Sequence, residues 1–258
     1  QIQAGALDPR SLISPYTYSM KKKNNPLFPG APTITAVIVR RIEKRTIKKA
    51  LTAGADMLEI RVDTFSQRSP EQLTRAVKRL KGYDGTGNIP LLLTCRARSE
   101  GGVHAVTLRE KRLIFRALMP FVSYIDIELR RAAGYSDVIA EAKKAGVGVI
   151  VSYHDFKATP GAARLSRIIR QGRACGADAV KIAATANSRE DILRLTATLL
   201  GQRNLIVIAM GPLGAATRVF FPLLGSLTTY GSVTGRSAPG QIPVIDLVTA
   251  FRTYGIYN

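Results

Sequence analysis

One lysine, Lys181, stands in the middle of a short run of small and apolar residues, 176–184. If the run is a β-strand, its side chains alternate between two faces, and Lys181 shares a face with Ala179 and Ala183. These small neighbours leave the lysine room. Burial lowers the pKa of a lysine towards the range in which the free amine attacks a carbonyl carbon. Lys181 is therefore a candidate for an imine (Schiff base) with a substrate. The alternative is a strand-end lysine whose side chain reaches back to water.

A histidine and several arginines could take part in the same chemistry. Histidine titrates near neutral pH, so His154 could move protons for an imine on Lys181 if the two lie on neighbouring strands. Taken alone, His154 could be a structural histidine, with Asp155 capping the next helix. The planar guanidinium group suits carboxylates and hydroxyl-rich molecules, so the arginines near these residues indicate a small anionic substrate.

Charged residues also occupy one face of two other short runs. Glu59, Arg61 and Asp63 alternate with apolar residues in the first run, and Asp126 and Glu128 do so in the second. A barrel strand turns one face to the helices and the other to the barrel centre, so these charges should converge near the C-terminal mouth. Converging buried charges are typical of an active site. For Asp126, a fixed ion-pair network is an equal alternative.

The elements that must position these residues recur in a regular order. From residue 34 onward, a short β-rich run is followed by a helical stretch, and the pair is repeated along the chain. This order predicts one α/β domain, a (β/α)8 TIM barrel, over residues 33–258. The expected strands are residues 34–39, 57–62, 89–95, 124–129, 147–152, 179–183, 205–209 and 227–230. The expected helices are residues 46–53, 70–81, 108–119, 135–145, 162–175, 190–200, 217–223 and 242–254.

The N-terminal segment, residues 1–32, lacks this order. It is rich in proline and includes a basic run at residues 21–23, and the first methionine is Met20. We expect a flexible tail or a remnant of expression that does not enter the fold.

The composition favours a soluble protein of the reducing cytoplasm. With 258 residues and 46% hydrophobic content, the chain can bury a large core. No stretch is long and apolar enough to cross a membrane. The two cysteines, Cys95 and Cys175, lack the spacing of a disulfide framework or a metal site, and two histidines leave little scope for a His-rich metal site. We therefore expect no metal.

The net charge of +20 invites a nucleic-acid hypothesis. However, the basic residues are spread over the expected helices and do not form one stripe with exposed aromatic residues. Dispersed positive charge is typical of solvated helix faces, and it would also steer an anionic small substrate. A nucleic-acid-binding scaffold is therefore the minor alternative, and we expect no nucleic-acid partner.

Six segments carry a resemblance to a known family. They are residues 59–65 (Glu-Ile-Arg-Val-Asp-Thr-Phe), 94–102 (Thr-Cys-Arg-Ala-Arg-Ser-Glu-Gly-Gly), 125–129 (Ile-Asp-Ile-Glu-Leu), 152–156 (Ser-Tyr-His-Asp-Phe), 180–183 (Val-Lys-Ile-Ala) and 237–242 (Ser-Ala-Pro-Gly-Gln-Ile). Together, and in this order, they resemble type I 3-dehydroquinate dehydratase over residues 34 to 254. Any one segment is a weak signal, whereas six in the same order are a strong one.

The resemblance implies a lyase of the shikimate pathway of aromatic amino acid biosynthesis. Such an enzyme dehydrates 3-dehydroquinate to 3-dehydroshikimate through a Schiff base, without a metal or another cofactor. By this resemblance, Lys181 forms the imine with the substrate ketone. His154 is the general base at the carbon next to the imine and then the general acid on the departing hydroxyl, and Glu100 orients His154.

The resemblance also implies a set of substrate-binding residues. Arg218 would pair with the substrate carboxylate, and Ser237 and Gln241 would close over the substrate. The substrate hydroxyls would be held by Glu59, Arg61 and Arg96, with Asp63, Asp126 and Glu128 in support.

Some details depart from the family and leave alternatives open. The first expected strand lacks the serine and glycine often found there, and residues 210–214 include Pro212 and Leu213 where a more polar sequence is common. The role of Arg218 therefore depends on the spacing behind that loop. The nearest alternative is a class I aldolase acting on a sugar phosphate, because glycine-rich loops after the last strands could bind phosphate. We also expect a homodimer formed by barrel helices, but no stretch of the sequence identifies which helices form the interface.

Overall fold

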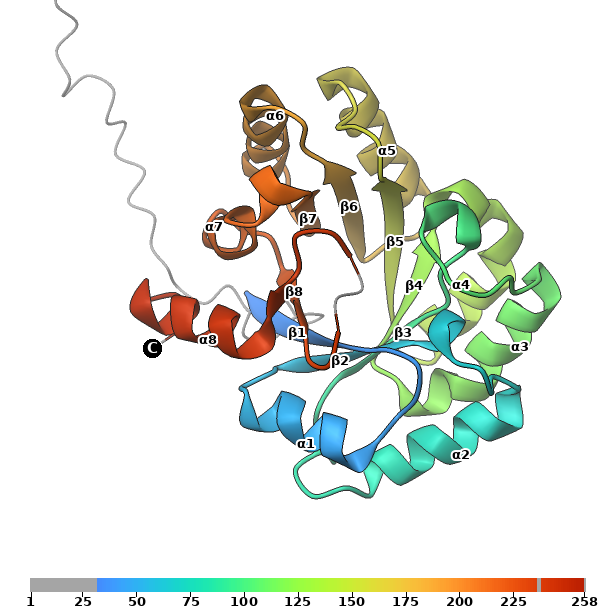
Figure 1. Ribbon diagram of the computed structural model, residues 1–258. Helices are drawn as coiled ribbons and strands as arrows, with labels where there is room; N and C mark the ends of the chain where they lie inside the picture. The colour runs from blue at the N-terminus through green and yellow to red at the C-terminus, as the bar shows by residue number, and fades with distance from the viewer. Residues whose placement is uncertain (1–31, 236–237, 258) are drawn as a thin grey trace, which may run out of the picture.

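The computed structural model describes residues 32–235 and 238–257, which form the predicted (β/α)8 barrel (Figure 1). The strands surround a common centre and the helices lie outside them. The strands are β1 (Thr33–Ile38), β2 (Met57–Arg61), β3 (Leu91–Thr94), β4 (Tyr124–Glu128), β5 (Gly148–Asp155), β6 (Ala179–Thr185), β7 (Leu205–Met210), β8 (Thr228–Ser232) and the short β9 (Ile242–Pro243). The α-helices are α1 (Lys44–Thr52), α2 (Pro70–Lys81), α3 (Leu108–Leu118), α4 (Ser136–Lys144), α5 (Ala162–Ala174), α6 (Arg189–Leu200), α7 (Thr217–Leu223) and α8 (Val244–Thr253).

All paired strands are parallel, in the hydrogen-bonded order β7-β6-β5-β4-β3-β2-β1-β8-β9. The seam of the barrel lies between β7 and β8. There the backbone N–H of Leu227 donates to the carbonyl of Leu205 at 2.9 Å. The backbone N–H of Val207 also donates to the hydroxyl of Ser226 at 3.1 Å. These two bonds connect β7 with the residues that lead into β8, and so close the barrel between the two strands.

Side-chain alternation separates two apolar layers, as the sequence predicts for β6. Ala179 and Ala183 pack inside the barrel with residues of the other strands. Val180 and Ile182 pack on the opposite face with apolar residues of α5 and α6. Lys181 therefore lies on the inward face of β6, between Ala179 and Ala183 on that same face.

Helix starts follow from local capping. Ser69 and Gln72 form a reciprocal capping box at the start of α2, where Pro70 occupies the first turn. Thr107 and Glu110 do the same for α3. These capping residues set the first residue of each helix. The predicted range 70–81 is confirmed at both ends.

Two strands of the site are longer than the predicted ranges. The strand expected at 147–152 continues to Asp155 in β5, and the one expected at 179–183 continues to Thr185 in β6. His154 therefore pairs with Ala183 inside the sheet and does not lie in a loop. Polar residues at 154–155 end the apolar pattern, but ladder hydrogen bonds do not depend on side-chain polarity. The predicted tail, residues 1–32, lies outside the described residues apart from Pro32.

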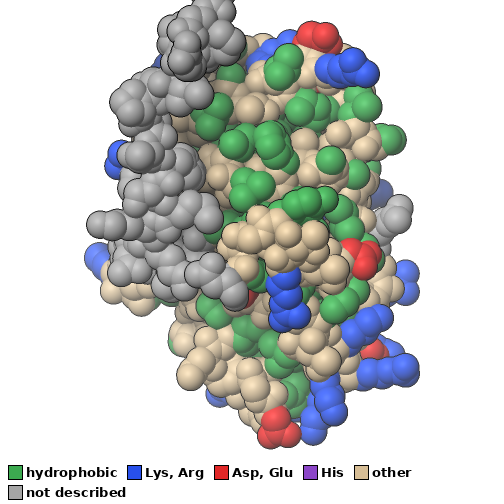
Figure 2. Space-filling view, turned by 90° about the vertical axis from the view of Figure 1, so that its left-hand side faces the viewer, with side chains coloured by type: hydrophobic (Ala, Val, Ile, Leu, Met, Phe, Trp, Pro, Cys, Tyr) green, Lys and Arg blue, Asp and Glu red, His purple; other side chains and the backbone are tan. Residues whose placement is uncertain are grey.

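The outer surface is not uniformly basic. Figure 2 shows the face at the left of Figure 1, where apolar side chains gather. Exposed apolar residues on the elements of this side include Leu193 and Leu200 of α6, Phe220 of α7 and Ile245 of α8. Among the described helices, none has the length and apolarity that a membrane span requires.

Candidate active site

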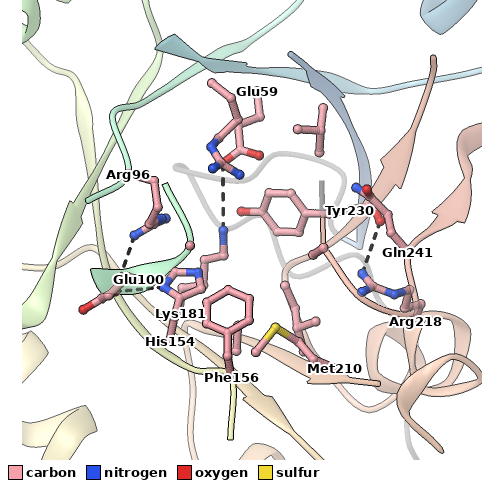
Figure 3. A pocket seen from close by; sticks show the side chains of 16 residues that line it. Glu59, Arg96, Glu100, His154, Phe156, Lys181, Met210, Arg218, Tyr230 and Gln241 are labelled. Atoms are coloured by element: carbon pink, nitrogen blue, oxygen red, sulfur yellow. Dashed lines mark hydrogen bonds and ion pairs between the residues drawn. The ribbon is translucent and has the colours of Figure 1, made fainter. Parts of the chain in front are cut away.

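One cavity at the C-terminal mouth of the barrel brings the predicted residues together (Figure 3). Its walls come from the strands, from α7 and from the loops after β3, β5 and β8. The predicted residues that line it are Glu59, Arg61, Arg96, Glu100, His154, Lys181, Arg218 and Gln241. The alternation of residues in the sequence predicts that charged side chains of several strands point inward. In the barrel these side chains surround one cavity.

Lys181 is buried at the centre of this cavity, with 4% of its surface exposed. Its Nζ atom lies 3.6 Å from Oδ2 of Asp126 and 3.9 Å from Oε1 of Glu59. Burial lowers the pKa of the lysine. Glu59 and Asp126 oppose this effect in part, and the net direction remains downward. The cavity therefore holds an amine that loses its proton more readily than a surface lysine does.

His154 lies on the same inward face, on the neighbouring strand. In the ladder, Ser152 is beside Lys181 and His154 is beside Ala183, so His154 lies two residues nearer the barrel mouth than Lys181. Burial lowers the pKa of His154 well below its ordinary value, and the positive charges of Arg96 and Lys181 add to the effect. The imidazole is therefore neutral near pH 7 and can accept a proton.

Glu100 holds one nitrogen of the His154 ring. Its Oε2 atom lies 3.1 Å from Nδ1 of the imidazole, and the carboxylate is buried. Burial raises the pKa of Glu100 to about 7, although the positive charge of Arg96 acts in the other direction. With Nδ1 engaged, Nε2 is the ring nitrogen left for a substrate.

The loop that carries Glu100 depends on a glycine. A Cβ atom on Gly102 would lie 2.2 Å from the backbone oxygen of Arg96, so a larger residue cannot fold back so tightly against the end of β3. The short 3-10 helix Arg98–Glu100 precedes this glycine. The Glu-Gly-Gly sequence therefore turns the carboxylate into the cavity.

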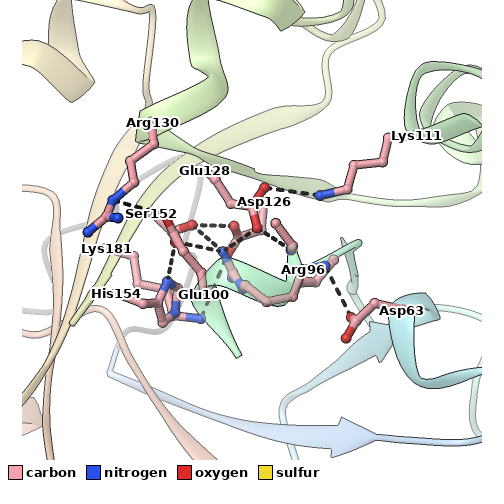
Figure 4. A network of polar contacts seen from close by, with 12 residues as sticks. Asp63, Arg96, Glu100, Lys111, Asp126, Glu128, Arg130, Ser152, His154 and Lys181 are labelled. Carbon is pink, nitrogen blue, oxygen red and sulfur yellow. Dashed lines mark hydrogen bonds and ion pairs between the residues drawn. The ribbon is translucent and has the colours of Figure 1, made fainter. Parts of the chain in front are cut away.

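Arg96 is the centre of a buried polar network (Figure 4). Its guanidinium group donates to Oδ2 of Asp126 at 2.9 Å and to the hydroxyl of Ser152 at 2.8 Å. Ser152 donates in turn to Oδ1 of Asp126 at 2.5 Å. Asp126 thus belongs to an ion-pair network, and two donors of Arg96 are already used within the protein.

Two further carboxylates organise the loop after β3. Glu128 accepts a hydrogen bond from Nζ of Lys111 at 3.0 Å and another from the backbone N–H of Ala97. Asp63 binds the guanidinium group of Arg61 at 2.9 Å and 3.0 Å and accepts a bond from the backbone N–H of Arg96 at 3.1 Å. Neither acid lines the cavity, and each holds a residue of the loop that follows β3.

Arg218 reaches the cavity from α7 as a buried cation. It donates to the carbonyl oxygens of Gly240 (2.7 Å), Pro239 (3.1 Å) and Tyr230 (3.3 Å). Among the described residues no acid pairs with it, and burial lowers its pKa to about 10. A guanidinium group has five N–H donors, so two have no partner among the residues that the structure describes.

The loop around Arg218 also depends on a glycine. Gly240 has φ +70°, and a Cβ there would lie 2.6 Å from the carbonyl oxygen of Gly211. Gln241, which follows it, is buried and lines the cavity. Ser237 lies outside the described residues.

Sequence reasoning gave no role to three residues of this site. They are Tyr230, which lines the cavity, and Ser152 and Lys111, which belong to the network. Lys111 had a detectable signal, because it shares one helix face with the buried Ile114, Phe115 and Leu118. Within the described part of the chain, no group of three His, Cys, Asp or Glu residues could hold a metal ion.

Comparisons with known proteins show which family this chain resembles over most of its length. The family model described as type I 3-dehydroquinase matches residues 35–258. The 3-dehydroquinate dehydratase of Methanococcoides burtonii is 34% identical over 217 residues, which cover 83% of this chain and 92% of that protein. The crystal structure of 3-dehydroquinate dehydratase from Aquifex aeolicus has a TM-score of 0.78 and 32% identity, and covers 87% of this chain and 100% of that one.

A deoxyribose phosphate aldolase from Aeropyrum pernix has a TM-score of 0.54 at 13% identity, and covers 89% of this chain and 92% of that one. This likeness shows a shared fold alone.

Proposed function

The chain belongs to the type I 3-dehydroquinase family, and we propose that it converts 3-dehydroquinate to 3-dehydroshikimate through an imine on Lys181. The enzyme is a hydro-lyase of the shikimate pathway. One observation supports the imine most strongly: the buried Lys181 amine, with its lowered pKa, shares a face with His154 of the neighbouring strand. Family membership also decides between this reaction and the aldolase alternative.

The first step joins the substrate to Lys181. The free amine forms a C–N bond to the ketone carbon, the π electrons of the carbonyl move to its oxygen, and that oxygen leaves as water. One proton taken up from solvent makes the product a protonated imine, and this proton is released again when the imine is hydrolysed at the end of the cycle. Asp126 and Glu59, at 3.6 Å and 3.9 Å from Nζ, stabilise its positive charge.

The second step removes a proton and a hydroxyl. His154 accepts a proton from the carbon next to the imine, because the positive imine makes that carbon more acidic. The electrons of the broken C–H bond move towards the imine nitrogen and return as the hydroxyl leaves. His154 gives its proton to that hydroxyl, which departs as water. A second water molecule then hydrolyses the imine and frees Lys181, so the balance is one substrate to one product and one water.

The remaining residues hold the substrate in our proposal. The two free N–H donors of Arg218 bind the substrate carboxylate, and Gln241 lies beside it in the cavity wall. Glu59 and Arg61 bind hydroxyl groups. Arg96 also lines the cavity, and it binds a hydroxyl group through donors that Asp126 and Ser152 do not occupy.

The test is chemical trapping of the imine. Protein is incubated with 3-dehydroquinate and borohydride, and the reduced adduct is located by intact-protein and peptide mass spectrometry. We expect an adduct on the peptide that contains Lys181. Folded protein that turns over 3-dehydroquinate without forming an adduct would disprove the imine, and absence of turnover would disprove the substrate.

Binding partners and location remain predictions. A homodimer is tested by sedimentation of the purified chain, and a cytoplasmic location by fractionation of the source cells. The predicted absence of nucleic-acid binding is tested by a binding titration at several salt concentrations, in which a scaffold for nucleic acid would show tight and steeply salt-dependent binding.

A further inference from the structure

Two tyrosine hydroxyls of the described chain are buried without a hydrogen-bond partner, those of Tyr135 and Tyr230. Both rings are almost fully buried, with 1% and 4% of their surface exposed. A buried hydroxyl without a partner is unfavourable, because folding removes its hydrogen bonds to water without replacing them. Such a group in a folded protein therefore calls for an explanation.

The two hydroxyls differ in what they face. Tyr135 packs in the apolar layer between the strands and the helices, with its ring edge against Phe115. Tyr230 is on β8, points into the barrel and lines the cavity that holds Lys181. Only the second hydroxyl of this pair can meet a substrate.

The ring of Tyr230 lies directly over the proposed nucleophile. Nζ of Lys181 is 4.0 Å from the centroid of this ring. Figure 3 shows the hydroxyl end of Tyr230 turned towards Lys181 and Glu59, and away from Arg218 and Met210. The first substrate oxygen to come close to this hydroxyl is therefore the one on the carbon that Lys181 attacks.

We propose that the Tyr230 hydroxyl donates a hydrogen bond to the substrate carbonyl oxygen during imine formation, and is a catalytic residue of this step. The proposal rests on the proposed function, since it needs Lys181 to attack a ketone. As the C–N bond forms, the π electrons of the carbonyl move to the oxygen, and a donor already aimed at that oxygen stabilises the growing negative charge. The same contact serves the reverse addition of water when the product imine is hydrolysed.

The surroundings of Tyr230 favour a donor over a base. Burial raises the pKa of its hydroxyl well above the ordinary value, and the negative charges of Glu59 and Asp126 add to this effect. The hydroxyl thus keeps its proton throughout the working pH range. His154, with its lowered pKa, remains the group that accepts protons.

The test compares Tyr230→Phe with Tyr135→Phe. Each change removes one buried, unpartnered hydroxyl and keeps the ring, so neither should lower the unfolding temperature. With 3-dehydroquinate and rapid borohydride quenching, we expect Tyr230→Phe to form the trapped adduct about 100-fold more slowly, as for loss of one donor to a developing oxyanion. Tyr135→Phe should match the wild type.

A kinetic isotope effect separates this role from loosened packing. With substrate deuterated at the carbon that loses its proton, imine formation should limit the rate in Tyr230→Phe, so the isotope effect on kcat should fall towards 1. An adduct rate equal to wild type, or an unchanged isotope effect, would overturn the proposal for Tyr230. Failure of the wild-type protein itself to form an adduct would instead overturn the imine on Lys181.

Discussion

The Nδ1 atom of His154 lies 3.1 Å from Oε2 of Glu100. The pKa values of the two groups are shifted in opposite directions from their ordinary values. Burial raises the pKa of Glu100 to about 7 and lowers that of His154 well below its usual value. The pair therefore takes up its next proton near pH 7, mainly on Glu100. Below this pH the carboxylate no longer supports a positive charge on the imidazole.

We predict that kcat/KM of the wild type falls as the pH drops through about 7. In Glu100→Gln the remaining titrating group is His154, whose pKa is well below 6.5. The acid limb should therefore move to lower pH, while the maximal rate falls by about 10- to 100-fold because the imidazole loses its orienting carboxylate. A pH–rate profile of both proteins checks this. An unmoved acid limb in the variant would show that another group controls it.

Lys181→Met should keep the fold and abolish the reaction. Methionine fills a similar volume without an amine, so no imine can form, and turnover should fall by at least about 10⁴-fold. His154→Ala is the informative companion, because it keeps the amine: the adduct should still be trapped by borohydride while turnover stalls. Mass spectrometry and steady-state kinetics on the same samples measure both. Wild-type-like turnover in either variant would refute the role assigned to that residue.

Arg218→Met should act mainly on substrate binding. Within the described part of the chain, Arg218 has two N–H donors left after its three bonds to backbone carbonyls. Loss of their charge-assisted bonds should raise KM by about 10- to 100-fold and change kcat less. Arg170→Met, an exposed arginine on α5, is the control for charge alone. A KM equal to wild type in Arg218→Met would exclude a carboxylate contact.

Asp126→Asn should lower stability in a pH-dependent way. Burial alone would raise the pKa of Asp126, but Arg96 and Lys181 hold it below its ordinary 3.8. A carboxyl whose pKa is lowered by folding stabilises the fold above its unfolded pKa, about 3.9, and this contribution is lost as the pH falls through the lower folded value. At pH 7 the variant should lose about 3 kcal/mol, because two buried cations lose a counter-charge.

Urea unfolding between pH 7 and pH 3 measures this difference, which should shrink on acidification. The matched control is Asp137→Asn, since Asp137 pairs with Arg112 and Arg116 on the surface. Its effect should stay within about 1 kcal/mol at every pH. Equal losses in the two variants would contradict a structural role for the buried network.

The sequence alone predicted the fold, and it predicted for most site residues that their side chains point into the barrel. The repeat of strand and helix predicts the barrel, and the period of two along each strand predicts which residues face its centre. Lys181 and Glu59 lie inward as expected, and the capped start of α2 was located to the residue. These features depend on the local geometry of the backbone, which neighbouring residues in the sequence determine.

Only the tertiary structure decided which inward groups bind one another. The sequence placed Arg96 near a substrate, and Arg96 does line the cavity, but only the barrel shows that Asp126 of β4 and Ser152 of β5 occupy two of its donors. It gave Tyr230 no role, whereas closure of the ring sets this tyrosine from β8 over the lysine of β6. The strand period determines which face a side chain points to, but distances across the barrel depend on its stagger and closure. The hydrogen-bond partners of the inward side chains, and the shifts in their pKa values, follow from those distances.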